Sequence, residues 1–143
     1  MKIQYPIITI SSKNHIEFFK SDKELKKCNK RALKNGYYNK LILIDSSSKK
    51  YRIQSATEEG TIGILWGFNL LRGQQLKVKL IFDKKIKNIE LDEFQNLLIK
   101  KINRNIDIWD SDGNLKKRIK FIKSTNSIKE ILAKFTYEYY KIY

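Results

Sequence analysis

Gln75-Leu-Lys-Val-Lys-Leu-Ile-Phe82 is a segment in which apolar and basic side chains alternate. The apolar side chains occupy every second position: Leu76, Val78, Leu80 and Phe82. Lys77 and Lys79 fall between them. Because successive side chains of a β-strand lie on opposite faces, the pattern predicts a strand with one face buried and the other in water. The chain should therefore contain a sheet that covers an apolar core.

Four further segments have the composition of strands and are bounded by turn-forming residues: 3–10, 15–19, 40–45 and 51–56. Ser11-Ser-Lys-Asn14 separates the first two, and residues 46–49 separate the last two. Short polar turns between such segments favour antiparallel pairing. The sequence therefore predicts two hairpins that precede the strand at 75–82.

A helix is predicted from Ser21 to a left-handed end at Gly36. Ser21-Asp-Lys-Glu24 has the spacing of a capping box, in which the serine oxygen accepts a backbone N–H and the glutamate returns one bond. The apolar residues of this segment would lie near one face of the helix: Leu25, Cys28 and Leu33.

Two more helices are predicted in the second half of the chain. Apolar residues recur at helical spacing through residues 92–104, and again after Ser127-Ile-Lys-Glu130, a second capping box. Residues 106–123 fit either a helix or a hairpin whose turn is Asp110-Ser-Asp-Gly113. The spacing of the apolar residues at 115, 119 and 122 favours the helix.

These elements predict an α+β fold with an antiparallel sheet of about five strands and three to four helices packed mainly on one side. The 143 residues suit one domain, residues 1–143, because no Pro-, Gly- or Ser-rich linker interrupts them. No secretory signal and no run long enough to span a bilayer is seen, and the single cysteine fits a reducing compartment. A cytoplasmic location is therefore expected.

The longest uncharged run is Gly60-Thr-Ile-Gly-Ile-Leu-Trp-Gly-Phe-Asn-Leu-Leu71. If this run is extended, Trp66 and Phe68 share a face, with Arg72 close by. Aromatic and arginine side chains are the usual anchors of protein interfaces, so these three residues are candidate partner contacts, with Trp109 as a second candidate. The alternative is that Trp66 and Phe68 fill the core.

The net charge of +15 suggests an acidic partner. The basic residues are mostly lysine and spread evenly over both halves of the chain, a pattern that an ordinary solvated surface also gives. Two local clusters are candidates for binding a polyanion: Lys84, Lys85 and Lys87, and Lys116, Lys117 and Lys120. No signature of a known nucleic-acid-binding module accompanies them.

The sequence contains no set of residues with the spacing of a catalytic, cofactor or metal site. His15 is the only histidine and Cys28 the only cysteine, which excludes a Cys/His zinc site within the chain. The acidic pairs Glu58/Glu59 and Asp110/Asp112 are typical of solvated strands and turns. We therefore expect no enzymatic activity, no cofactor and no bound metal.

Several runs of this sequence resemble a group of short bacterial proteins thought to be immunity proteins of toxin systems. The runs are Tyr5-Pro-Ile-Ile-Thr-Ile, Ile16-Glu-Phe-Phe, Ser21-Asp-Lys-Glu-Leu, Asn35-Gly-Tyr-Tyr, Leu43-Ile-Asp-Ser and Leu65-Trp-Gly-Phe-Asn-Leu. The resemblance covers about the first 80 residues and, more loosely, the closing helices. It implies a role as a toxin inhibitor and carries no catalytic motif.

The function expected from the sequence is therefore that of a non-enzymatic immunity protein, which neutralises a cognate bacterial toxin by covering it. The expected partner is a toxin domain with an acidic surface, because the chain itself is strongly basic. The alternative is a basic module that binds nucleic acid. Association with a membrane is not expected, because the predicted helices have ordinary core faces and no lipidation motif is present.

Overall fold

The structure is a computed structural model that describes residues 1–62, 68–69 and 73–142. The strands are β1 (Ile7–Ile10), β2 (Ile16–Phe19), β3 (Lys27–Asn29), β4 (Leu41–Asp45), β5 (Lys49–Thr61), β6 (Phe68–Asn69), β7 (Gly73–Phe82) and β8 (Lys87–Asn88). The helices are α1 (Asp22–Leu25), α2 (Lys30–Lys34), α3 (Leu91–Asn103), α4 (Ile106–Trp109), α5 (Leu115–Ser124) and α6 (Ile128–Ile142).

The strands form an antiparallel sheet in the order β2-β1-β4-β5-β7-β3, with β6 paired to β7 and β8 paired to β5. Both predicted hairpins are present, and the α+β class is confirmed. The sheet has more strands than the five expected. The additional strands β3, β6 and β8 were not predicted because they are only two or three residues long. Strands this short leave no alternating pattern in a sequence.

The sheet curls until its two edge strands come near each other. The edges β2 and β3 are neighbours in the sequence, and α1 joins them while contacting both. A connection of this length brings opposite edges together only if the sheet bends round on itself. The sheet therefore has an enclosed inner face and an outer face, each with its own apolar cluster.

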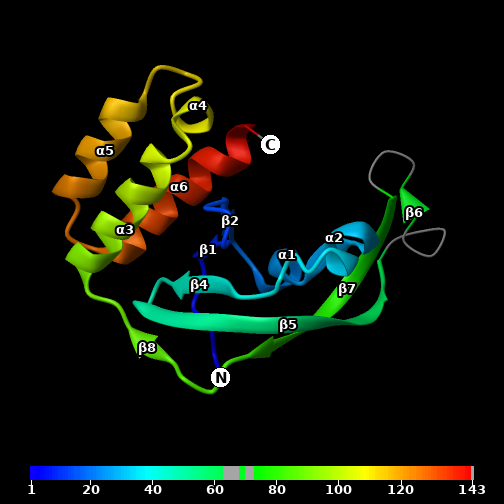
Figure 1. Ribbon diagram of the computed structural model, residues 1–143. Helices are drawn as coiled ribbons and strands as arrows, with labels where there is room; N and C mark the ends of the chain where they lie inside the picture. Colours follow the sequence, from blue (N-terminus) through cyan, green and yellow to red (C-terminus); the bar gives the residue numbers. More distant parts are fainter. Residues whose placement is uncertain (63–67, 70–72, 143) are drawn as a thin grey trace.

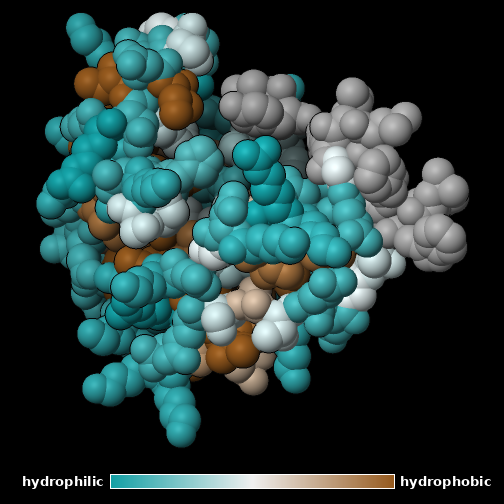
Figure 2. Space-filling view, turned by 45° about the vertical axis from the view of Figure 1, so that its right-hand side comes forward, coloured by the Kyte–Doolittle hydropathy of each residue, from teal (hydrophilic) through white to brown (hydrophobic). Residues whose placement is uncertain are grey.

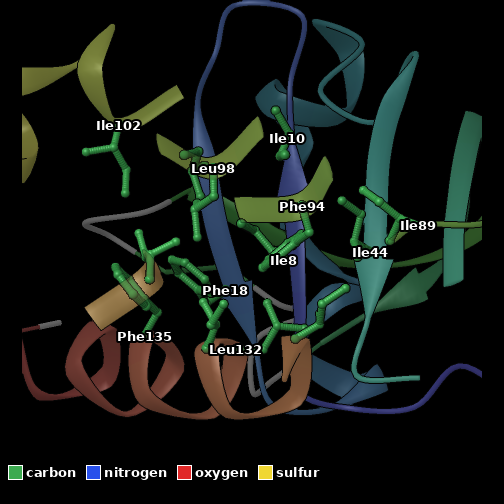
Figure 3. Close-up of a cluster of buried hydrophobic side chains, with 14 residues drawn as sticks. Ile8, Ile10, Phe18, Ile44, Ile89, Phe94, Leu98, Ile102, Leu132 and Phe135 are labelled. Atoms are coloured by element: carbon green, nitrogen blue, oxygen red, sulfur yellow. The ribbon is translucent and has the colours of Figure 1, made fainter. Parts of the chain in front are cut away.

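The outer cluster lies between the sheet and the three longest helices, α3, α5 and α6 (Figure 1). The register places Ile8 opposite Ile44, so both side chains point from the sheet toward these helices. Figure 3 shows Leu132 and Phe135 of α6 pointing toward the strands that carry Ile8 and Phe18. These contacts attach the helical half of the chain to β1, β2 and β4.

The inner cluster fills the curl of the sheet. It is formed by Ile7, Leu25, Cys28, Tyr38, Leu41, Leu43, Tyr51, Ile53, Val78 and Leu80. Val78 and Leu80 are buried and Lys77 and Lys79 exposed, as the alternation in β7 predicts. Strands β1 and β4 therefore carry apolar side chains on both faces, which makes them the centre of the fold.

The single helix predicted from Ser21 to Gly36 is wrong. The capping serine does accept the Glu24 N–H at 3.4 Å, but α1 ends at Leu25 and the chain then extends as β3. Cys28 lies opposite Leu76 of β7, so its backbone pairs with an otherwise open sheet edge. That pairing outweighs the helical preference of a few residues. Helix resumes as α2, and Gly36 follows it with the expected positive φ of 70°.

Residues 106–123 are largely helical, as the apolar spacing favours. Helices α4 and α5 occupy most of the segment. Asp110-Ser-Asp-Gly113 is a turn, but it joins two helices instead of two strands. Asp110 Oδ1 accepts the Leu115 N–H at 3.1 Å, and Gly113 has a φ of 70° that favours glycine.

Asp45, at the end of β4, is fully buried and accepts five hydrogen bonds. Oδ1 accepts from the Ser47 N–H at 2.9 Å, the Ser47 hydroxyl at 2.7 Å and the Lys49 N–H at 3.0 Å. Oδ2 accepts from the Gln4 N–H at 3.1 Å and the Tyr51 hydroxyl at 3.0 Å. One carboxylate therefore holds the N-terminal segment, the β4–β5 turn and strand β5 together.

Two buried tyrosines predict a loss of stability in alkali. Burial, with the Asp45 hydrogen bond, raises the pKa of Tyr51 to about 12, and burial near Cys28 raises the pKa of Tyr38 further. The unfolded chain releases these protons near pH 10, so the stabilisation is complete below about pH 10 and decreases above it. Each tyrosine should lower the free energy of unfolding by about 1.4 kcal/mol per pH unit in this range.

Urea unfolding followed between about pH 9 and pH 11.5 measures this decrease. The Tyr51→Phe variant should reduce the slope by about 1.4 kcal/mol per pH unit, because it removes a proton that the folded chain retains and the unfolded chain releases. An identical slope in the wild type and the variant would contradict the assignment to Tyr51.

Candidate functional site

An aromatic groove of about 420 Å³ lies where α4 and the following turn meet β2 and α6. It is lined by His15, Ile16, Phe18, Asn105, Ile108, Trp109, Ser111, Arg118, Phe135, Glu138 and Tyr139. Most of these side chains come from segments far apart in the sequence. The groove therefore depends on the packing of the helical half against the sheet.

The floor of the groove is a cluster of aromatic rings centred on Phe18. The ring centroid of Phe18 lies 5.8 Å from Phe135 in a stacked arrangement, 6.3 Å from Trp109 edge-on and 5.9 Å from Tyr139. Trp109 also lies 5.9 Å from Phe135. Aromatic pairs at these separations stabilise one another beyond their burial. Trp109 is thus held in place while part of its surface stays open to the groove.

Arg118 of α5 fixes the wall of the groove. Its guanidinium donates to the Trp109 carbonyl at 2.8 Å and to both Asp112 carboxylate oxygens at 2.6 Å, and Nε lies 3.6 Å from Glu138. The hydrogen bonds from Arg118 lower the pKa of Asp112 well below its ordinary value, and Asp112 in turn raises the pKa of Arg118. The turn between α4 and α5 is therefore tied to α6.

An exposed apolar surface on α4 adjoins the groove. Ile106 and Ile108 of α4 have exposed fractions of 47% and 57%, which is unusual for isoleucine. Figure 2 shows that hydrophilic residues cover most of the visible face and leave separate apolar patches. Exposed isoleucines beside an aromatic hollow are a feature of surfaces that bind other proteins.

The groove brings His15 together with a serine and a carboxylate, although not in a catalytic geometry. His15 Nε2 lies 3.9 Å from Glu17 Oε1, and Ser111 and Glu138 line the same groove. The Ser111 hydroxyl donates to the Ile108 carbonyl at 3.2 Å. A nucleophile and its base must approach to hydrogen-bonding distance, and no such bond joins His15 to Ser111 in the described part of the chain.

Three of the four residues in the acidic pairs considered from the sequence make polar contacts in the fold, and Glu58 is exposed on β5. Asp112 binds Arg118, and Asp110 caps the turn before α5. Glu59 Oε2 lies 3.1 Å from Lys77 Nζ on the neighbouring strand. Over residues 1–62, 68–69 and 73–142, no three His, Cys, Asp or Glu side chains are grouped as a metal site would require.

The structure describes only part of the predicted partner-binding set. Trp109 is among the residues that line the aromatic groove. Trp66 and Arg72 lie outside the described residues, and for Phe68 the structure describes the backbone of β6 alone. No sequence signal pointed to the groove as a whole, because its lining comes from four separate segments.

The two lysine clusters predicted for polyanion binding line different hollows. Lys85 and Lys87 lie in one cleft, whereas Lys116 and Lys120 border a shallow hollow on α5 and Lys117 borders another. Lys84 is exposed beside the first cleft. The clusters are therefore not parts of a single hollow.

The cleft that contains Lys85 and Lys87 is more basic than the sequence indicated. This basic cleft, of about 610 Å³, has six cationic side chains: Lys40, Lys50, Arg52, Lys85, Lys87 and Lys101. Lys50 and Arg52 lie on β5, and Lys101 lies on α3. The charges come from four regions of the chain. The lysine cluster at 84–87 signals only one of these regions, and the sequence does not show that Lys40, Lys50, Arg52 and Lys101 join it.

One hairpin turn separates the aromatic groove from the basic cleft. Ser11 and Ser12 line the cleft, whereas His15 lines the groove. Between them, Asn14 Oδ1 accepts from Lys101 Nζ at 2.6 Å, and the Asn14 carbonyl accepts from Asn105 Nδ2 at 3.0 Å. The β1–β2 turn is therefore anchored to the end of α3.

A third cleft, of about 910 Å³, opens between the two sheet edges. Glu17, Cys28 and Tyr38 line it. Burial raises the pKa of Glu17 and of the Cys28 thiol, so the thiol stays protonated at neutral pH. A protonated, buried thiol is a poor nucleophile.

Comparison with protein-family models, with curated proteins and with solved structures finds no match to this chain. Of the helices that the structure describes, none has the length and apolarity needed to cross a lipid bilayer.

Proposed function

We propose that this chain is a non-enzymatic binding protein that neutralises a bacterial toxin by covering it. The observation that carries the proposal is the aromatic groove, in which Trp109 is open to the surface and its backbone is held by Arg118. Tryptophan and arginine are the side chains most often found at the energetic centre of protein interfaces. A preformed groove also keeps the entropy lost on binding small.

The exposed isoleucines of α4 support a protein as the partner. Ile106 and Ile108 extend the apolar surface beyond the groove, and His15 and Glu138 supply a polar edge. An apolar centre within a polar rim is the usual anatomy of an interface. A small polar metabolite would gain little from such a surface.

The charge of the chain supports an acidic partner. A net charge of +15 accelerates encounter with a negatively charged surface, and the association rate should fall as salt is added. An inhibitor that acts by occlusion needs no chemistry of its own, only shape and charge that match its target. The resemblance of the first 80 residues to suspected immunity proteins supports the toxin as that target.

The groove predicts that Ile108→Asp weakens partner binding without unfolding the chain. A carboxylate on this apolar surface should weaken binding about 100-fold, because a buried, unpaired charge opposes the contact. Ile108 is 57% exposed, so stability should change by only about 0.5 kcal/mol. Ile81→Asp is the matched control, on a 40% exposed isoleucine of β7, which Figure 1 places away from α4.

The test uses the wild type and both variants as bait in a lysate of the organism that encodes the chain, with a high-salt wash. The wild type and Ile81→Asp should retain one stoichiometric protein that Ile108→Asp loses. That protein, produced alone in a host cell, should stop growth, and co-production of the wild-type chain should restore it. A captured protein that is harmless would overturn the toxin role, and equal loss with both variants would exclude the groove. Recovery of nucleic acid alone, lost as salt rises, would favour the alternative function.

A further inference from the structure

The basic cleft concentrates positive charge that the protein does not neutralise. Asp83 is the one carboxylate among its described lining residues, and Glu93 lies 3.5 Å from Lys50 at the edge. Within the described chain, no carboxylate approaches Lys40, Arg52, Lys85 or Lys87 to ion-pair distance. An anion placed in the cleft would relieve this repulsion.

The pairing of β5 with β8 adds to the repulsion. The register sets Lys50 directly opposite Lys87. Like charges in directly opposed positions destabilise a sheet, whereas opposite charges stabilise it. The sequence therefore keeps an unfavourable pair at the mouth of this cleft.

The backbone at Lys40 is strained at the same place. Lys40 has a φ of 62°, in the left-handed region that favours glycine and asparagine. A lysine there is less stable than a glycine would be, because its Cβ crowds the backbone. Strained backbone conformations and other destabilising arrangements are found more often at binding sites, where they serve the function of the site.

Lys101 closes the cleft from the side of α3. Its ammonium donates to Asn14 Oδ1 at 2.6 Å, and burial lowers its pKa, with Arg104 and Lys100 lowering it further. Ile10 and Ile42 contribute apolar surface to the lining. Charges beside apolar surface interact more strongly with a ligand than charges in open water.

We propose that the basic cleft binds the phosphate groups of a polyanion. Five of its six cations are lysines, which bind phosphate as compact point charges and impose no fixed bidentate geometry on the ligand. The one aromatic residue of the lining, Tyr51, turns its hydroxyl to buried Asp45 and offers no face for stacking a base. The site therefore recognises phosphoryl oxygens without reading a nucleotide sequence. Free polyphosphate and the backbone of a nucleic acid share this chemistry.

Isothermal titration of three probes tests the site: tripolyphosphate, a short single-stranded oligodeoxynucleotide, and an oligoglutamate of matched charge. The double variant Lys85→Gln/Lys87→Gln removes two exposed lysines of the cleft that make no ion pair within the described chain. Lys116→Gln/Lys120→Gln on α5 is the control, because it removes the same charge from exposed lysines of another hollow. The cleft variant should weaken phosphate binding about tenfold and the control by less than about twofold.

Tighter binding of the oligonucleotide would identify a nucleic-acid backbone as the ligand, and tighter binding of tripolyphosphate a free phosphate compound. Equal losses in the two variants would overturn the proposal, because the effect would then follow net charge alone. Oligoglutamate that binds as tightly as either phosphate probe would also overturn it, and so would the failure of both phosphate probes to bind. None of these results bears on the toxin test, whose variant lies in the aromatic groove.

Discussion

Asp45→Ala is expected to lower the free energy of unfolding by about 4 kcal/mol. The substitution removes the carboxylate that accepts five hydrogen bonds. The Tyr51 hydroxyl and three backbone N–H groups then lose their acceptor. Buried donors that lose their partner destabilise a fold by about 1–3 kcal/mol each, and partial access to water at the turn limits the total. Urea unfolding monitored by circular dichroism measures the loss.

Two further variants show whether the carboxylate acts through its hydrogen bonds. Tyr51→Phe removes one donor and should lower stability by about 1–2 kcal/mol. Asp107→Ala removes an exposed carboxylate of α4 and should stay within about 0.5 kcal/mol of the wild type. If Asp45→Ala were no worse than Asp107→Ala, the network would contribute little to the fold.

Phe18→Ala should also destabilise the chain by about 4 kcal/mol. Phe18 is 1% exposed and contacts the rings of Trp109, Phe135 and Tyr139. Its removal leaves a cavity at the point where β2 meets the helices, and three aromatic contacts are lost with it. The near-ultraviolet circular dichroism of Trp109 should weaken in the folded variant, because its ring loses the edge-on contact.

Two control substitutions show whether the loss of stability comes from the packing of Phe18 or from the loss of any aromatic side chain. Phe18→Leu keeps most of the side-chain volume and should lower the free energy of unfolding by about 1.5 kcal/mol. Tyr137→Ala removes an aromatic side chain of α6 that is 63% exposed and should change stability by about 0.5 kcal/mol. Similar stabilities for Phe18→Ala and Tyr137→Ala would show that the aromatic cluster is not a structural centre. Because Phe18 forms the floor of the groove, Ile108→Asp remains the cleaner variant for partner binding.

Strand β7 and the long helices could be predicted because each has one face in a core and one in water. Strand β7 and helix α3 show the two periods, 2 and 3.6, that follow from such burial. Strands β1 and β4 are apolar on both faces and could be predicted from their β-branched content instead. Strand β3 could not be predicted, because its conformation is decided by a partner strand about 50 residues away. A strand of three residues is too short to show an alternation of apolar and polar side chains.

The candidate sites were less visible in the sequence than the fold. Trp109 could be singled out as a rare aromatic residue, but its neighbours Phe18, Arg118 and Phe135 meet it only through tertiary packing. The basic cleft gathers Lys40, Arg52 and Lys101 from three separate elements or their ends. The chain has 30 basic residues, and the sequence does not distinguish the lysines that meet in this cleft from those that are simply exposed to solvent.

The curl of the sheet sets the order in which the chain can complete its fold during synthesis. Lys27 pairs with Lys77, so the ribosome must add 50 residues after β3 before its partner strand exists. At about 5–20 residues per second, this interval lasts roughly 3–10 s. Throughout it, Leu25 and Cys28 have no β7 to pack against, and the edge of β3 is unpaired. The pairing of β3 with β7, which closes the sheet, is therefore a late event in the folding of the nascent chain.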